Sequence, residues 1–85
     1  METEKQGNPK AGPVFQKRLG SVRVAVFKNA SEKGGAWFNV RIVRQYRKGE
    51  EWREAPTFNG LADLALVEEA VRYAKEFINQ QALAA

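Results

Sequence analysis

The spacing of the apolar residues changes along the chain, and this change constrains the fold more than any other feature. Val22, Val24 and Val26 alternate with other residues, and the pattern repeats at Phe38, Val40 and Ile42. A period of two is typical of half-buried β-strands. From residue 61 to about residue 80 the apolar positions instead recur every three or four residues, without proline, as in an amphipathic helix. We therefore predict an α+β fold in which a sheet of three or four strands precedes one long C-terminal helix.

The chain of 85 residues is long enough for one small domain. We expect that domain to span 14–80, with β regions over 14–29, 36–47 and 50–58. Lys48-Gly49 predicts a tight turn, 29–35 reads as a loop, and Pro56 either places the last strand at an edge or ends it. Residues 1–13 are rich in chain breakers and are expected to form a flexible leader. Residues 81–85 either extend the helix or fray.

Composition excludes several classes of protein. The chain has no Cys and no His, which rules out disulfides, thiolate or imidazole metal sites and a Ser-His-Asp triad. Glu50, Glu51 and Glu54 cluster near a turn, so a small carboxylate–metal enzyme is one alternative, although a polar turn needs solvated charges anyway. No cofactor motif is present. We expect no catalysis, no cofactor, no metal and no small-molecule substrate.

The sequence gives no sign of a membrane segment. No apolar run approaches the roughly 20 residues that cross a bilayer. The polar N-terminus lacks the apolar core of a signal peptide. The expectation is a cytoplasmic protein, associated with the nucleoid if it comes from a bacterium or a phage.

The positive charge is concentrated in the strand-rich part. The chain carries a net charge of +4, yet residues 17–48 hold nine basic groups against one acid, while residues 50–85 hold three against seven. Such a split favours an anionic partner on one face of the protein. The alternative is a solvated strand face that is rich in arginine.

The helix carries two apolar stripes roughly 100° apart. One is formed by Leu64, Val67, Val71, Ala74 and Ile78, and the other by Leu66, Ala70, Tyr73 and Phe77. The sheet covers one stripe, and an identical helix from a second subunit is the simplest cover for the other. We therefore expect a homodimer with Leu66, Ala70, Tyr73 and Phe77 at its interface. The alternative is one wide core stripe under a curled sheet.

The strand faces suggest a binding surface. If the valine face lies against the helix, the opposite face carries Arg23, Phe27, Trp37, Asn39 and Arg41. Basic side chains neutralise phosphates and exposed rings stack on unpaired bases, so this mixture favours single-stranded nucleic acid. The alternative for Phe27 and Trp37 is burial under a loop or in a dimer contact.

Two further pairs of residues are ambiguous. Trp52 and Arg53 have opposite parity, so only one of them can lie on the outer face. Strict alternation places Arg44 and Tyr46 on the helix side, unless a bulge after Ile42 shifts the register. The full set of candidates is Lys17, Arg18, Arg23, Lys28, Arg41, Arg44, Arg47 and Arg53 for phosphates, with Phe27, Trp37 and Trp52 for bases.

The runs FQKRLGSVRVAVFKN (15–29), WFNVRIVRQYR (37–47) and EWREAPTFN (51–59), followed by the helix, resemble the positive cofactor 4 family. These transcriptional coactivators bind single-stranded DNA and are related in fold to the Whirly proteins. The resemblance implies a curved antiparallel four-stranded sheet and a homodimer paired through its helices. Here the fourth strand comes either from a split near Leu19-Gly20 or from 55–58.

The resemblance also assigns individual residues. Phe27 falls where the family has a base-stacking Phe, and Arg44 where it has a basic strand residue in an Arg-x-Tyr stretch. Arg47 replaces the stacking Trp of the family, which is a departure. The expected partner is single-stranded DNA, with RNA as an alternative, in transcription, replication or recombination. A competing hypothesis is a protein-binding adaptor or phage-type inhibitor whose basic face meets an acidic partner.

Overall fold

A computed structural model describes residues 12–30 and 35–84 of the chain. Its elements are β1 (Phe15–Leu19), β2 (Val22–Ala30), β3 (Ala36–Lys48), β4 (Glu51–Ala55) and α1 (Gly60–Ala84). The strands form one antiparallel sheet in the order β1-β2-β3-β4, which confirms the α+β prediction. The predicted leader over 1–13 lies outside the described residues, apart from Gly12 and Pro13, and so do positions 31–34 of the predicted loop.

Two tight turns produce the fourth strand and fix the register. Leu19 pairs with Val22, so the first β region is split at Gly20-Ser21, as one of the two alternatives predicted. Gly20 has a φ of 61°, and a Cβ atom there would lie 3.2 Å from Leu66 Cδ1, so glycine lets this turn approach the helix. Lys48 pairs with Glu51 around Gly49, which confirms the second turn. The edge strand β4 ends at Ala55, directly before Pro56.

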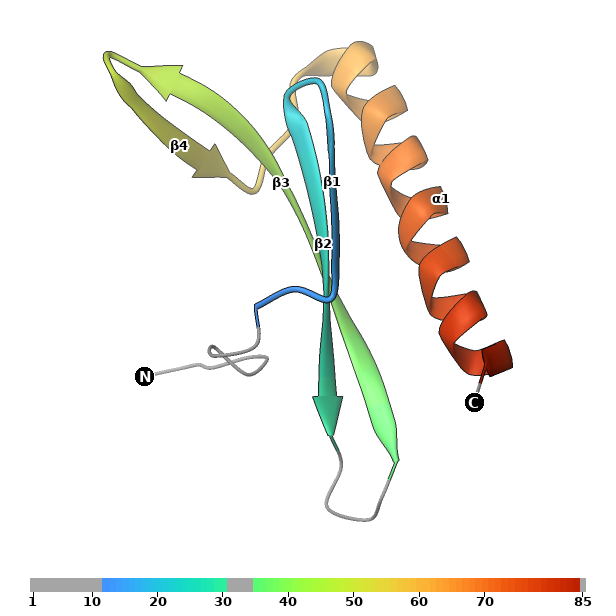
Figure 1. Ribbon diagram of the computed structural model, residues 1–85. Coiled ribbons are helices and arrows are strands. Elements are labelled where there is room, and N and C mark those ends of the chain that lie inside the picture. Colours follow the sequence, from blue (N-terminus) through green and yellow to red (C-terminus); the bar gives the residue numbers. More distant parts are fainter. Residues whose placement is uncertain (1–11, 31–34, 85) are drawn as a thin grey trace.

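The register between β2 and β3 is continuous, and this resolves the ambiguity at Arg44. Pairing runs without a bulge from Val22 opposite Arg44 to Ala30 opposite Ala36. Arg44 therefore stays on the same side of the sheet as Ile42. The Arg44 side chain contacts the Thr57 carbonyl oxygen in the segment before α1 and is not part of the core. The helix runs alongside β1 and β2, while the β3–β4 hairpin extends away from it (Figure 1).

The core lies between α1 and the central strand. Val22, Val24 and Val26 are fully buried there and meet Ala70 and Ala74 of the helix. The small alanine side chains allow the helix to approach the sheet closely. Around them pack half-buried residues from β1, β3, the segment between β4 and α1, and the helix, namely Phe15, Leu19, Phe38, Ile42, Phe58, Leu66, Val67, Phe77 and Ile78.

The predicted roles of the two helix stripes need correction. Ala70 is fully buried against the sheet, and Phe77 stacks on Phe15 with ring centroids 5.1 Å apart. The stripe of Leu66, Ala70, Tyr73 and Phe77, which was expected to face a second subunit, thus packs on the chain's own sheet. Val67, Ala74 and Ile78 of the other stripe pack there too, as the alternative of one wide core stripe predicted. The apolar side chains that remain exposed on α1 are Leu61, Leu64 and Val71, with Val40 exposed on β3.

Polar contacts hold both the start and the outer face of α1. The Asp63 carboxylate accepts hydrogen bonds from the Asn59 backbone N–H (2.8 Å) and from the Ser21 hydroxyl (3.2 Å), which ties the β1–β2 turn to the first helical turn. On the outer face Arg72 contacts Glu69 and Glu76, and the hydrogen bond from Arg72 to Glu69 lowers the pKa of the Glu69 carboxyl group.

The helix continues to Ala84 instead of fraying after Gln80, because the segment after Gln80 contains neither Gly nor Pro. Within the described part of the chain, no helix is both long and apolar enough to cross a membrane.

Candidate nucleic-acid interface

The side of the sheet opposite α1, called the open face below, combines basic and aromatic side chains. The alternation of the paired strands places four arginines, two tryptophans and one phenylalanine on it, with a single carboxylate. Its strand residues are Gln16, Arg18, Arg23, Ala25, Phe27, Asn29, Trp37, Asn39, Arg41, Val43, Gln45, Arg47, Trp52 and Glu54. Two small apolar residues on it, Ala25 and Val43, are buried despite facing away from the helix. Longer neighbouring side chains therefore cover the centre of this face.

Most of the predicted binding residues share the open face. They are Arg18, Arg23, Phe27, Trp37, Arg41, Arg47 and Trp52. Trp52 pairs with Arg47 and shares its face, whereas Arg53 pairs with Tyr46 and does not. The register thus selects Trp52 as the member of that pair that lies on the open face.

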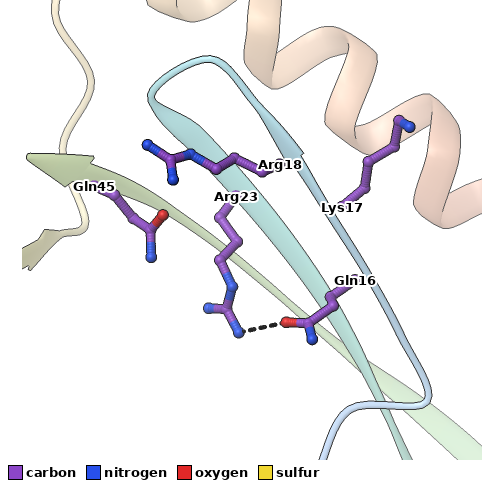
Figure 2. A pocket seen from close by; sticks show the side chains of 5 residues that line it. All are labelled: Gln16, Lys17, Arg18, Arg23 and Gln45. Carbon is purple, nitrogen blue, oxygen red and sulfur yellow. Dashed lines mark hydrogen bonds between the residues drawn. The ribbon is translucent and has the colours of Figure 1, made fainter.

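The remaining four candidates lie on the helix side of the sheet and do not join this surface. The Lys17 ammonium group lies 4.9 Å from the Tyr73 ring centroid, and Figure 2 shows its side chain directed toward α1. Arg44 donates from Nε to the Thr57 carbonyl oxygen at 2.9 Å. Arg53 pairs with Glu51 at 2.9 Å, and Lys28 is exposed opposite Phe38. A single strand lying on the open face would not reach these four groups.

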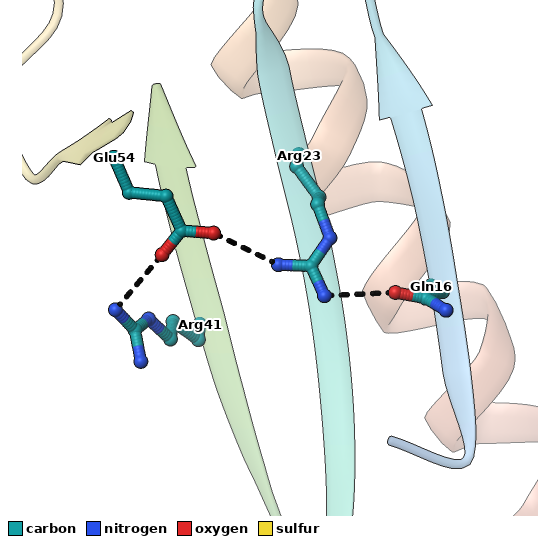
Figure 3. Close-up of polar contacts among 4 residues, drawn as sticks. All are labelled: Gln16, Arg23, Arg41 and Glu54. Carbon is teal, nitrogen blue, oxygen red and sulfur yellow. Dashed lines mark hydrogen bonds and ion pairs between the residues drawn. The ribbon is translucent and has the colours of Figure 1, made fainter. Parts of the chain in front are cut away.

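A chain of polar contacts crosses all four strands on the open face (Figure 3). The Glu54 carboxylate accepts from Arg41 at 3.2 Å and from Arg23 at 3.4 Å. Arg23 donates in turn to Gln16 Oε1 at 2.8 Å. Glu54 therefore holds two guanidinium groups in place and offsets part of the positive charge of this face.

Trp52 lies within cation–π distance of two arginines from other strands. The Arg18 guanidinium is 5.1 Å from the Trp52 ring centroid and the Arg47 guanidinium is 5.7 Å from it. Arg18 belongs to β1 and Trp52 to β4, and these two edges of a flat four-stranded sheet would be about 14 Å apart. Contact between their side chains therefore shows that the sheet curls toward the open face at this end.

The far end of the open face carries the other two aromatic rings. Trp37 is 51 % exposed and Phe27 is half-buried, so neither is enclosed in a core. Asn29 pairs with Trp37, and its Nδ2 atom is buried without a hydrogen-bond partner among the described residues. The exposed part of the Trp37 indole can stack on an unpaired base, whereas the buried Asn29 nitrogen is not accessible to it.

The carboxylates of the third β region do not converge. Glu51 pairs with Arg53 on the helix side, whereas Glu54 contacts Arg23 and Arg41 on the open face. Over residues 12–30 and 35–84, no three acidic side chains come together in a way that could hold a metal ion.

Pattern reasoning overlooked four polar residues of the open face as candidate binding groups. They are Gln16, Asn29, Gln45 and Glu54. Their placement follows from the two short turns, because a two-residue turn fixes which residues oppose each other across a hairpin. The sequence signal that could have predicted this placement is the glycine in each turn, at positions 20 and 49.

Comparisons with protein-family models, with curated proteins and with solved structures gave no match to this chain.

Proposed function

We propose that this protein binds single-stranded DNA on the open face, largely independently of sequence, and that it does so as a homodimer. The observation that carries the proposal is the segregation of side chains by the sheet. One side is covered by α1, and the uncovered side gathers Arg18, Arg23, Arg41 and Arg47 with three aromatic rings. Arginines release counterions from phosphates, and rings stack on bases that are not paired.

The geometry of the rings favours a single strand over a duplex. Trp37 and Trp52 are both more than half exposed and lie on the same surface as the arginines. The bases of a duplex are stacked on each other, so their flat faces are inaccessible to such rings, whereas an unpaired strand exposes them. The resemblance to the positive cofactor 4 family supports the same partner.

The proposed dimer uses the apolar side chains that the chain leaves exposed. Leu64 and Val71 are 48 % and 41 % exposed and belong to one helix stripe. Tyr73, on the other edge of the helix, meets Lys17 of β1, so Leu64 and Val71 face the β3 side, where Val40 is also exposed. The chain's own core is small, with seven buried apolar residues among those described. A second copy joined by twofold symmetry would cover the exposed side chains of both chains.

The test is the binding of a fluorescent dT oligonucleotide of about 20 nucleotides, followed by anisotropy at several salt concentrations, with a duplex of equal length as control. We expect tight binding that weakens steeply as salt rises, a much weaker duplex, and quenching of tryptophan fluorescence. Equal binding of both forms, or no binding at low salt, would contradict the proposal. An acidic protein partner would then be the better explanation of the basic face.

A further inference from the structure

A cavity of about 310 Å³ opens on the open face where β1, β2 and β3 run side by side (Figure 2). It is lined by Gln16, Arg18, Arg23 and Gln45 of the open face and by Lys17, which lies between the first two on β1 and whose side chain is directed toward α1 (Figure 2). Its volume is at the lower end of the range of about 300–1,000 Å³ typical of small-ligand sites. Arg18 both lines the cavity and lies 5.1 Å from the Trp52 ring centroid, so one side chain separates the cavity from an aromatic ring.

The polar groups of this cavity are held in place before any ligand arrives. Arg23 donates to Gln16 at 2.8 Å and to Glu54 at 3.4 Å, and its side chain is only 27 % exposed. Arg18 donates from Nε to the Gly20 carbonyl oxygen at 3.0 Å. A guanidinium carries five N–H donors, and the described contacts of Arg23 use two of them. The cavity thus offers oriented donors at little further cost in side-chain entropy.

The donor set matches guanine better than the other bases. An arginine binds the O6 and N7 acceptors of guanine with two parallel hydrogen bonds. The Gln45 amide oxygen can accept from the N1–H and N2–H groups on the opposite edge of the same base. A phosphate group suits the cavity less well, because the Glu54 carboxylate already lies beside the Arg23 guanidinium and would repel a second anion.

We propose that this cavity takes up one unstacked guanine, so that a bound strand acquires a preferred register. The inference deepens the proposed function and rests on it. The rest of the open face binds any single strand, whereas Arg23 and Gln45 read one base. Arg18 and Trp52 flank the site and keep the neighbouring base stacked.

The experiment compares dT oligonucleotides of about 20 nucleotides that carry, at one central position, dG, dA, dC, dT or an abasic site. Competition anisotropy at one fixed salt concentration gives the affinity of each relative to all-dT. We expect the dG oligonucleotide to bind about fivefold or more tightly, the low end of what one bidentate Arg–guanine pair provides. The other substitutions should lie close to all-dT.

Two variants of the same face provide the matched comparison. Arg23→Lys keeps the charge but removes the planar fork, so the ratio of dG to all-dT affinity should fall to about one. Arg41→Lys is the control, since Arg41 also contacts Glu54 but does not line the cavity, and its ratio should equal that of the wild type. In Gln45→Leu the ratio of dG to all-dT affinity should also fall, because the amide oxygen that accepts from the guanine N1–H and N2–H groups is removed. Far-ultraviolet circular dichroism verifies that each variant is folded.

The other possible results contradict the guanine site alone or the proposed function as well. A wild-type ratio near one with tight all-dT binding overturns the guanine site and leaves the proposed function standing. An abasic site that binds as tightly as dG shows that contacts to the base do not produce the preference, which also overturns it. Failure to bind any of the oligonucleotides overturns the proposed function, and the guanine site falls with it.

Discussion

Glu54 is the single residue whose position most affects the charge of the open face. It is the one carboxylate there among the described strand residues, and it contacts both Arg23 and Arg41. Exposed ion pairs contribute little to stability, about 0–1 kcal/mol each, because water and salt screen them. Glu54 is therefore better explained as a group that orients two guanidiniums than as one that holds the fold together.

Glu54→Gln should strengthen the binding of dT oligonucleotides. The change keeps an acceptor for the arginines but removes the negative charge, so one more phosphate can be neutralised and the salt slope should steepen by about 0.7. Glu51→Gln is the matched control, because Glu51 lies on the same strand but pairs with Arg53 on the helix side. Anisotropy titrations of both variants check this. Equal effects of the two changes would mean that only the total charge matters.

Single-residue placement could be predicted from sequence only where alternation was unambiguous. Arg23, Phe27, Trp37 and Arg41 were correctly assigned to the face opposite the helix, since each lies within a clear period of two. Lys17 was not, because its direction depends on the turn at Gly20 and on a contact with Tyr73, 56 positions away in the sequence. Such a contact leaves no local pattern.

Among the secondary-structure elements, α1 shows why tertiary packing decides what sequence pattern leaves open. Its two apolar stripes have the same helical spacing, so the period alone could not say how the helix is rotated against the sheet. The sheet contacts the line between the two stripes, where Ala70 of one and Ala74 of the other lie, because small side chains permit close approach and let Phe77 reach Phe15 and Phe38. The existence and length of the helix were predictable, but its rotation about its own axis was not.

The rotation of the helix leaves Val71 exposed, which gives a prediction about the proposed dimer. Val71→Asp, at an exposed position, should leave the single chain folded but convert the proposed dimer to a monomer in sedimentation experiments at micromolar concentration. Val14→Asp is the control, since Val14 is 45 % exposed but lies before β1, away from the helix stripe. A Val71→Asp variant that sediments like the wild type would contradict the proposed interface.

Phe77→Ala should instead lower the free energy of unfolding of each chain by about 3 kcal/mol in urea unfolding, because it removes a packed ring.

In the whole molecule, the two sides of the sheet carry different kinds of side chain. The helix side supplies the core and the exposed apolar stripe, and the open face supplies cations, rings and a cavity. The curl of the β3–β4 hairpin brings Trp52 to Arg18, which strand order alone would keep apart. The α+β class followed from the sequence pattern, and the resemblance implied a curved antiparallel sheet. The contact between Arg18 and Trp52 joins non-neighbouring strands and leaves no local pattern in the sequence.

The most direct test removes the same charge from opposite sides of the sheet. The double variant Arg41→Ala/Arg47→Ala takes two cations from the open face, and Lys28→Ala/Arg53→Ala takes two from the helix side. Binding of the dT oligonucleotide should weaken, and its salt slope should become shallower by about 1.4, for the first variant only. Equal losses for both variants, or a larger loss for the second, would show that the open face is not where the strand binds.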